Sequence, residues 1–168
     1  MSSIGRISAI QYGLGPIGCS IARYAIERGI EMVGAVDINP KLAGQDLGDV
    51  LGIDRKLGVL ASVNENEVLP KVKADIVFHA TSSSLKHVIY QLESIMKAGS
   101  NVVSTCEELA YPWTRQADLA REIDRIAKDN SVTVLATGVN PGFVMDTWPI
   151  LMTAVCKEVK KIKVVRIQ

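Results

Sequence analysis

The 168-residue sequence has few of the residues that mark disulfide-rich, metal-binding or polyanion-binding proteins. It contains 3 cysteines, 2 histidines and 5% aromatic residues, and its formal net charge is +1. The cysteines are odd in number and widely spaced, which fits neither a disulfide framework nor a metal site, so we expect free thiols and no bound metal. A net charge this close to zero gives no electrostatic reason to expect a nucleic-acid partner.

Long apolar runs are also missing. No stretch approaches the roughly 20 apolar residues that a membrane span requires, and the first residues lack the charged and apolar pattern of a secretion signal. We therefore expect no membrane partner and a cytoplasmic location, where thiols stay reduced. With 48% hydrophobic residues, the chain is long enough to form one domain around a core of its own.

Short apolar runs alternate with amphipathic segments along most of the chain. Strands are expected at 6–12, 32–36, 59–60, 75–80, 101–104 and 132–136. Helices are expected near 17–28, 65–69, 85–96 and 112–127, the last opened by Pro112, with one helical turn near 47–51. This alternation predicts an α/β fold of the Rossmann type, a doubly wound parallel sheet covered by helices in a three-layer αβα arrangement.

A glycine-rich loop separates the first predicted strand from the first predicted helix. Its GxGxxG motif consists of Gly13, Leu14, Gly15, Pro16, Ile17 and Gly18. The first glycine allows the tight turn, the second lets the backbone approach a pyrophosphate, and the third lets the helix pack close to the strand. The motif in this position predicts a cofactor-binding loop, although a plain tight turn is the alternative.

An acidic residue stands where a dinucleotide site needs one. Asp37 ends the second predicted strand, about 20 residues after the glycine loop, where a carboxylate hydrogen-bonds the ribose 2′-OH. The loop and this carboxylate together predict NAD or NADP as the cofactor. The charge of Asp37 favours NAD, but nearby Lys41 leaves NADP open, and a simple strand-end cap is the plainer alternative.

Ligands of open α/β sheets lie beyond the carboxyl ends of the strands, so the residues that follow later strands are the next candidates. The small or polar residues expected to line the cofactor site there are Ala80, Thr81, Ser82, Thr105 and Cys106. We do not expect Cys106 to be a nucleophile, because the neighbouring carboxylates disfavour a thiolate.

Three residues near the same strand ends are candidates for a catalytic or substrate-binding role. They are His79, Glu107 and Asn140. Each also has a purely structural alternative. The histidine could be a buried packing residue, and the asparagine could cap a helix. Glu107 and its neighbour Glu108 could both be solvated surface charges.

Several motifs together resemble one family of dehydrogenases. They lie at 11–18, 36–37, 43–48, 79–83, 103–108 and 137–146. The combination resembles the N-terminal domain of the 2,4-diaminopentanoate dehydrogenase family, within the dihydrodipicolinate reductase-like group. The resemblance implies an NAD(P)-dependent oxidoreductase that transfers hydride between nicotinamide and the amine- or imine-bearing carbon of an amino acid. An imine reductase of lysine biosynthesis is the alternative, but the true reductases carry different motifs at 79–81 and 105–106.

The resemblance also implies a domain plan. Family members have a C-terminal domain that supplies most substrate contacts and the oligomer interface, and 160–167 alternates like a half-exposed strand. We therefore expect 1–158 to be the NAD(P)-binding domain and 159–168 to begin a substrate and oligomerisation domain missing from this chain. The chain should bind dinucleotide with little or no turnover of an amino-acid substrate, and the full-length form should be a homo-oligomer. A non-catalytic dinucleotide sensor and an S-adenosylmethionine-binding domain are the remaining alternatives.

Overall fold

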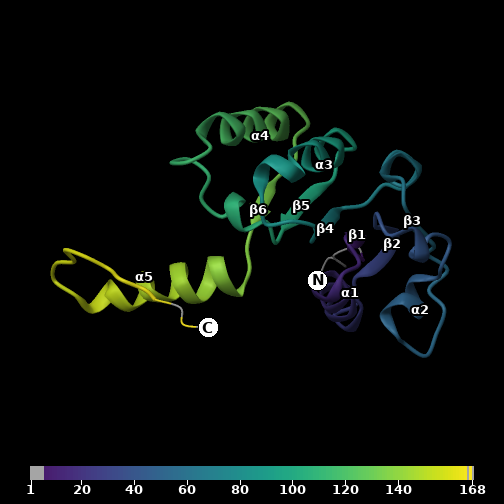
Figure 1. Cartoon of the computed structure of the whole chain (residues 1–168), viewed down its shortest axis with the longest axis horizontal. Helices are drawn as coiled ribbons and strands as arrows, with labels where there is room; N and C mark the ends of the chain where they lie inside the picture. Colours follow the sequence, from purple (N-terminus) through teal and green to yellow (C-terminus); the bar gives the residue numbers. More distant parts are fainter. Residues whose placement is uncertain (1–5, 166, 168) are drawn as a thin grey trace, which may run out of the picture.

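The computed structural model describes residues 6–165 and 167 and contains a parallel sheet of six strands (Figure 1). In chain order these are β1 (Ser8–Tyr12), β2 (Glu31–Val36), β3 (Ala61–Ser62), β4 (Ile76–His79), β5 (Asn101–Ser104) and β6 (Val134–Ala136). Their order across the sheet is β3-β2-β1-β4-β5-β6, and every pairing is parallel. This is the strand order of a Rossmann fold, so the predicted fold class is confirmed.

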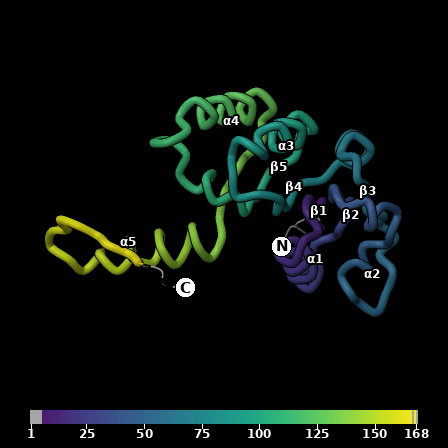
Figure 2. The backbone as a smooth tube through the Cα atoms, viewed as in Figure 1, coloured from purple at the N-terminus to yellow at the C-terminus, as the bar shows by residue number. Residues whose placement is uncertain are grey.

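Helices cover both faces of the sheet. They are α1 (Pro16–Glu27), α2 (Leu47–Leu51), α3 (Leu85–Lys97) and α4 (Ala117–Asp129). A partly helical segment at Val139–Thr147 runs into the short α5 (Trp148–Met152), which lies beside the sheet domain. Single turns of 3₁₀ helix lie at Pro40–Leu42, Glu65–Glu67, Glu107–Leu109 and Thr153–Val155. Helices α1 and α2 pack together on one face, and α3 and α4 pack together on the other (Figures 1 and 2).

The sequence of β1 explains why the sheet is covered twice. Ala9 belongs to the core cluster beneath α1 and α2, whereas Ile10 belongs to the cluster beneath α3 and α4, and both are fully buried. Successive side chains of a strand point to opposite faces, so an apolar run of this kind needs a helix layer on each side.

Helix α3 forms where its apolar stripe predicts it. Leu85, Val88, Leu92, Ile95 and Met96 are all buried against the sheet. Burying side chains of this size stabilises a fold by about 1.5–3 kcal/mol each, before the cost of ordering the chain.

Several predicted boundaries were wrong, including the start of β6, which lies at Val134 and not at 132. Helix α4 begins at Ala117 and not at Pro112, whose carbonyl instead accepts a hydrogen bond from the Gln116 amide in the turn before the helix. Pro112 is itself buried, but the exposed residues 113–115 separate it from the buried face of α4, which begins at Ala120. Strand β3 lies at Ala61–Ser62 rather than 59–60, because these two residues pair with the end of β2.

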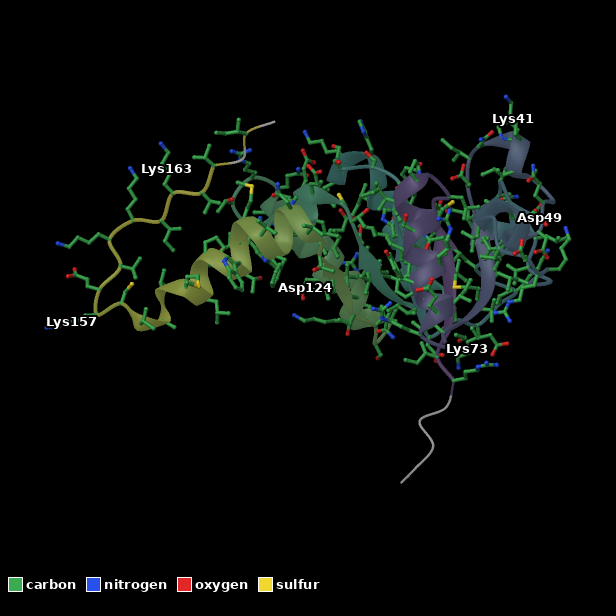
Figure 3. All side chains as sticks on the ribbon, turned by 90° about the horizontal axis from the view of Figure 1, so that it is seen from below. Lys41, Asp49, Lys73, Asp124, Lys157 and Lys163 are labelled. Atoms are coloured by element: carbon green, nitrogen blue, oxygen red, sulfur yellow. The ribbon has the colours of Figure 1, made fainter. Side chains whose placement is uncertain are left out.

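The predicted strand at 160–167 was also wrong for the residues that the structure describes. Residues 157–165 form no strand, and their side chains are exposed. A strand needs a neighbour to accept its hydrogen bonds, and this segment projects with α5 to one side of the sheet domain (Figures 1 and 2). We call residues 148–165 the projecting arm; Figure 3 shows Lys157 and Lys163 on it.

The three cysteines are free, as expected, and they differ in burial. Cys19 on α1 and Cys106 after β5 are buried, whereas Cys156 on the projecting arm is exposed. Within the described part of the chain, no helix has the length and apolar character needed to cross a membrane.

Candidate functional site

The glycine loop is packed tightly at two of its three glycines. Gly13 has a φ of 95°, and a Cβ atom on it would lie 2.2 Å from the Ala80 carbonyl oxygen at the end of β4. A Cβ atom on Gly18 would lie 1.9 Å from the Gly13 carbonyl oxygen. These two glycines therefore bring β1, β4 and α1 into direct contact, which fits the roles expected for them.

Gly15 has different surroundings. No atom lies within 4 Å of the position that its Cβ would take, so packing does not require glycine there. It is the N-cap of α1 and makes no side-chain cap, and Pro16 begins the helix. The first turn of a helix carries N–H groups without intrahelical acceptors and a partial positive charge. The open backbone at Gly15 therefore suits an anionic group such as a pyrophosphate.

Asp37 contacts the glycine loop directly. One carboxylate oxygen accepts a hydrogen bond from the Leu14 amide at 2.6 Å, and the other accepts one from the Asn39 amide at 2.8 Å. Each oxygen can accept a second hydrogen bond, so the carboxylate remains able to bind a hydroxyl group. Asp37 thus ties the loop to the end of β2, a role that its place in the sequence did not reveal. The side chain of Leu14 is buried in the core beneath α1.

A cleft of about 510 Å³ lies at the carboxyl ends of β4, β5 and β6, beside the start of α1. Its walls include Ile17, Ala80, Thr81, Ser82, Thr105, Cys106, Glu107 and Asn140. The topology therefore brings together all the residues predicted on the later strand ends, except His79, with one residue of the glycine loop. A Rossmann sheet binds its ligands at this edge.

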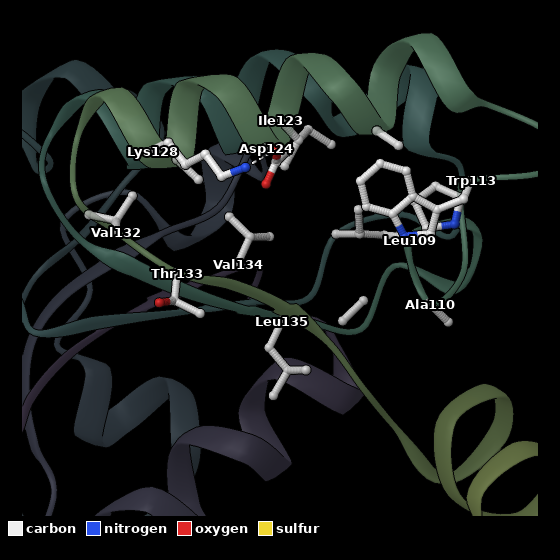
Figure 4. Close-up of a pocket in the computed structure, with 14 residues that line it drawn as sticks. Leu109, Ala110, Trp113, Ile123, Asp124, Lys128, Val132, Thr133, Val134 and Leu135 are labelled. Carbon is white, nitrogen blue, oxygen red and sulfur yellow. Dashed lines mark hydrogen bonds and ion pairs between the residues drawn. The ribbon is translucent and has the colours of Figure 1, made fainter.

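A second hollow, of about 450 Å³, lies between α4 and β6 (Figure 4). Trp113, Ile123 and Leu135 are among its apolar walls, and Lys128 forms an ion pair with Asp124 at its rim. None of the residues predicted for the site line this hollow, so we place the candidate site in the first cleft.

His79 does not reach the cleft surface. It is fully buried, its Nδ1 lies 2.9 Å from the Ser104 hydroxyl, and its Nε2 lies 2.8 Å from Oε1 of Gln91. The Thr81 hydroxyl lies 3.0 Å from the same Nε2. Burial lowers the pKa of His79 and keeps the imidazole neutral. These contacts fit the packing alternative rather than a proton carrier that meets substrate.

The two glutamates after β5 have separate roles. Glu107 is exposed and lines the cleft. Glu108 instead accepts hydrogen bonds from the Gln116 side chain, the Leu85 amide and the Ser84 hydroxyl, and these contacts lower its pKa. Ser84 occupies the N-cap position of α3 but its side chain makes no cap, and Glu108 instead accepts the hydrogen bond of the Leu85 amide at the start of the helix.

Cys106 and Asn140 complete the far wall of the cleft. Burial raises the pKa of the Cys106 thiol, which donates to the Ser83 carbonyl, so a thiolate is disfavoured as expected. Asn140 does not cap the helix that follows. Asn140, Pro141 and Gly142 have non-helical backbone angles, and at the end of this stretch the Gly142 amide donates to the Asp146 carboxylate. Asn140 is half-buried in the cleft wall and remains a candidate for ligand binding.

No model of a known protein family matches the chain. Its sequence is 37% identical over 160 residues to 2,4-diaminopentanoate dehydrogenase of Acetoanaerobium sticklandii, and this match covers 94% of the chain and 45% of that enzyme. Its structure is similar to that of an amine dehydrogenase from Mycobacterium smegmatis, with a TM-score of 0.83 and 36% identity over 88% of this chain and 44% of the other.

A more distant structure shares the fold alone. The WlbA dehydrogenase from Bordetella pertussis, solved in complex with NADH and UDP-GlcNAcA, has a TM-score of 0.58 and 20% identity over 79% of this chain and 37% of its own. The chain thus spans less than half the length of each of these three proteins. The resemblance predicted from the motifs is confirmed: the chain has a Rossmann fold and is similar to 2,4-diaminopentanoate dehydrogenase and to an amine dehydrogenase.

Proposed function

We propose that the chain binds a nicotinamide dinucleotide, with the pyrophosphate at the glycine loop and the nicotinamide end in the cleft beyond β4 and β5. The observation that carries this proposal is the space at Gly15. Packing fills the Cβ positions of Gly13 and Gly18, whereas that of Gly15 is open at the N-terminus of a 12-residue helix. A glycine that packing does not need is explained by a ligand that approaches the backbone.

We propose further that this domain serves an oxidoreductase acting on a small amino-acid substrate. The proteins similar to it are named 2,4-diaminopentanoate dehydrogenase and amine dehydrogenase. A bound nicotinamide supplies or accepts a hydride at the carbon that bears the amine or imine. The chain's own residues hold the cofactor: the loop binds the diphosphate, and Ala80, Thr81 and Thr105 offer a wall of small side chains.

The domain plan, assembly and location belong to the same proposal. Residues 1–158 form the cofactor domain, and 159–168 begin a second domain that supplies most substrate contacts. The full-length protein is a homo-oligomer in the cytoplasm. The exposed apolar side chains of the projecting arm, with Val155 93% exposed, support a further domain or subunit that covers them.

Calorimetric titration of the 168-residue chain tests the binding proposal. The chain should bind NADH, and Gly15→Val should weaken binding about tenfold or more with only a small change in the melting temperature, since no atom of the protein lies within 4 Å of the position of the new Cβ. Ala43→Val, which also creates a valine at an exposed loop position, is the control. Saturation by S-adenosylmethionine, without binding of NADH, would refute the proposal.

Asp37 should set the preference between the two nicotinamide cofactors. A carboxylate at the ribose repels the 2′-phosphate of NADPH, so Asp37→Asn should raise the affinity for NADPH relative to NADH. The amide oxygen can still accept one backbone hydrogen bond, which limits the disturbance of the loop. Competition titrations with both cofactors measure the ratio, and Asp54→Asn, an exposed carboxylate on another loop, should leave it unchanged.

A further inference from the structure

Two loops that form the cleft wall are joined beneath its surface by buried side chains. Thr81 follows β4 and Cys106 follows β5, and both line the cleft. Between them lie His79, Gln91 and Ser104, which do not line it and are almost fully buried. The connection spans the sheet and α3, since Gln91 belongs to that helix.

With Oε1 of Gln91 facing His79, the hydrogen bonds of this connection run in one direction. The amide of Cys106 donates to the Ser104 hydroxyl at 3.1 Å, so the hydroxyl proton is free to point to Nδ1 of His79, 2.9 Å away. On the other side, Oε1 of Gln91 can only accept, so Nε2 of His79 must carry its proton.

The Thr81 hydroxyl completes the connection on the β4 side. It donates to the same Gln91 oxygen at 2.8 Å. Its methyl group lies 3.2 Å from the position of a Cβ on Gly13, so it also packs against the glycine loop. A neutral imidazole, with one nitrogen donating and the other accepting, satisfies every link from Thr81 to Cys106.

We propose that His79 is a positioning residue that fixes the spacing and orientation of the Thr81 and Cys106 loops, and hence the fit of the cleft to the nicotinamide end of the cofactor. The inference rests on the proposed function. An apolar side chain would fill a core position beneath the sheet without the cost of burying polar groups. A fully satisfied polar network instead restrains the loops that it joins, because each hydrogen bond is lost if a loop moves.

The experiment compares the binding of NADH with that of ADP-ribose. ADP-ribose has the adenosine and diphosphate of NADH but lacks the nicotinamide, so it needs the glycine loop and not the far wall of the cleft. Ser104→Ala cuts the link to Cys106. Gln91→Met removes the oxygen that His79 Nε2 and the Thr81 hydroxyl share, which leaves only their direct 3.0 Å contact. Neither residue lines the cleft. Ser100→Ala is the matched control: its buried hydroxyl donates to the Ala74 carbonyl at 2.9 Å, just before the other end of β5.

Each cut should weaken NADH binding about two- to tenfold, the worth of a net hydrogen bond, while ADP-ribose binding changes less than the NADH affinity does. Ser100→Ala should lower the melting temperature without changing the ratio of the two affinities. If the folded Ser104→Ala and Gln91→Met variants bind NADH and ADP-ribose with the wild-type ratio of affinities, the inference is overturned. A wild-type chain that binds neither ligand would instead refute the proposed function.

Discussion

The three glycines of the loop differ in what the absence of a Cβ atom does for the structure. Gly18 faces the Gly13 carbonyl so closely that any side chain must displace the start of α1 from β1. Gly18→Ala should therefore lower the free energy of unfolding by about 1–3 kcal/mol, the usual cost of overpacking. Urea denaturation measures this loss, and a variant as stable as wild type would contradict the packing role.

The sequence predicts the positions of some site residues, but not the contacts of others. The GxGxxG motif lies between β1 and α1, as the sequence predicted, because its glycines and its flanking strand and helix are all local in the sequence. Its binding of a cofactor stays a prediction. The contacts of His79 depend on Ser104 and Gln91, which lie 25 and 12 residues away. No local pattern specifies such partners, because they meet only after β4 pairs with β5 and α3 packs above them.

Among the elements, helix α3 owes its N-terminal cap to another part of the chain. Glu108 accepts a hydrogen bond from the Leu85 amide at 2.7 Å, and Gln116 holds the same carboxylate at 2.7 Å. Glu108→Ala should lower the melting temperature more than Ser84→Ala does, since the serine makes no cap of its own. The reverse order in differential scanning calorimetry would show that the serine is the true cap.

The segment around α2 should be sensitive to acid. The Asp46 carboxylate accepts hydrogen bonds from the amides of Leu57, Gly48 and Gly58, and these hold its pKa below the ordinary value of 3.8. A lowered pKa stabilises the folded state above pH 3.8, and this stabilisation is lost as the pH falls through the folded-state pKa.

Amide hydrogen exchange can follow that loss. As the pH falls below 3.8, protection of Gly48, Leu57 and Gly58 should decrease more than protection of the β1 amides. In Asp46→Asn the pH-dependent part should disappear, because the amide does not titrate. Equal pH dependence in the variant and in wild type would assign the effect to other carboxylates.

The sequence predicts the position of an element when the element's own apolar side chains determine it. It does not predict the position of an element that depends on contacts with another part of the chain. Helix α3 and strand β5 lie where the sequence predicted them, since burial of their own side chains determines both. The start of α4, the place of β3 and the state of 157–165 depend on what lies beside them. Sequence periodicity carries no information about such contacts.

For the whole molecule, strand order alone determines where a ligand can bind. The chain runs outward from β1 to β3 and then returns across the sheet to β4, so the loops after β1 and β4 leave the sheet in opposite directions. The crevice between such loops is the binding place of open α/β sheets. Gly13 and Ala80 touch at this point, and the cleft begins beside them.

The different burial of the three cysteines has a practical consequence. Burial raises the pKa of Cys19 and Cys106, whereas Cys156 is exposed on the projecting arm. A disulfide reagent such as dithionitrobenzoate should therefore modify one thiol rapidly in the native chain and all three after denaturation. A maleimide dye would therefore attach at that one position on the projecting arm without a single engineered mutation.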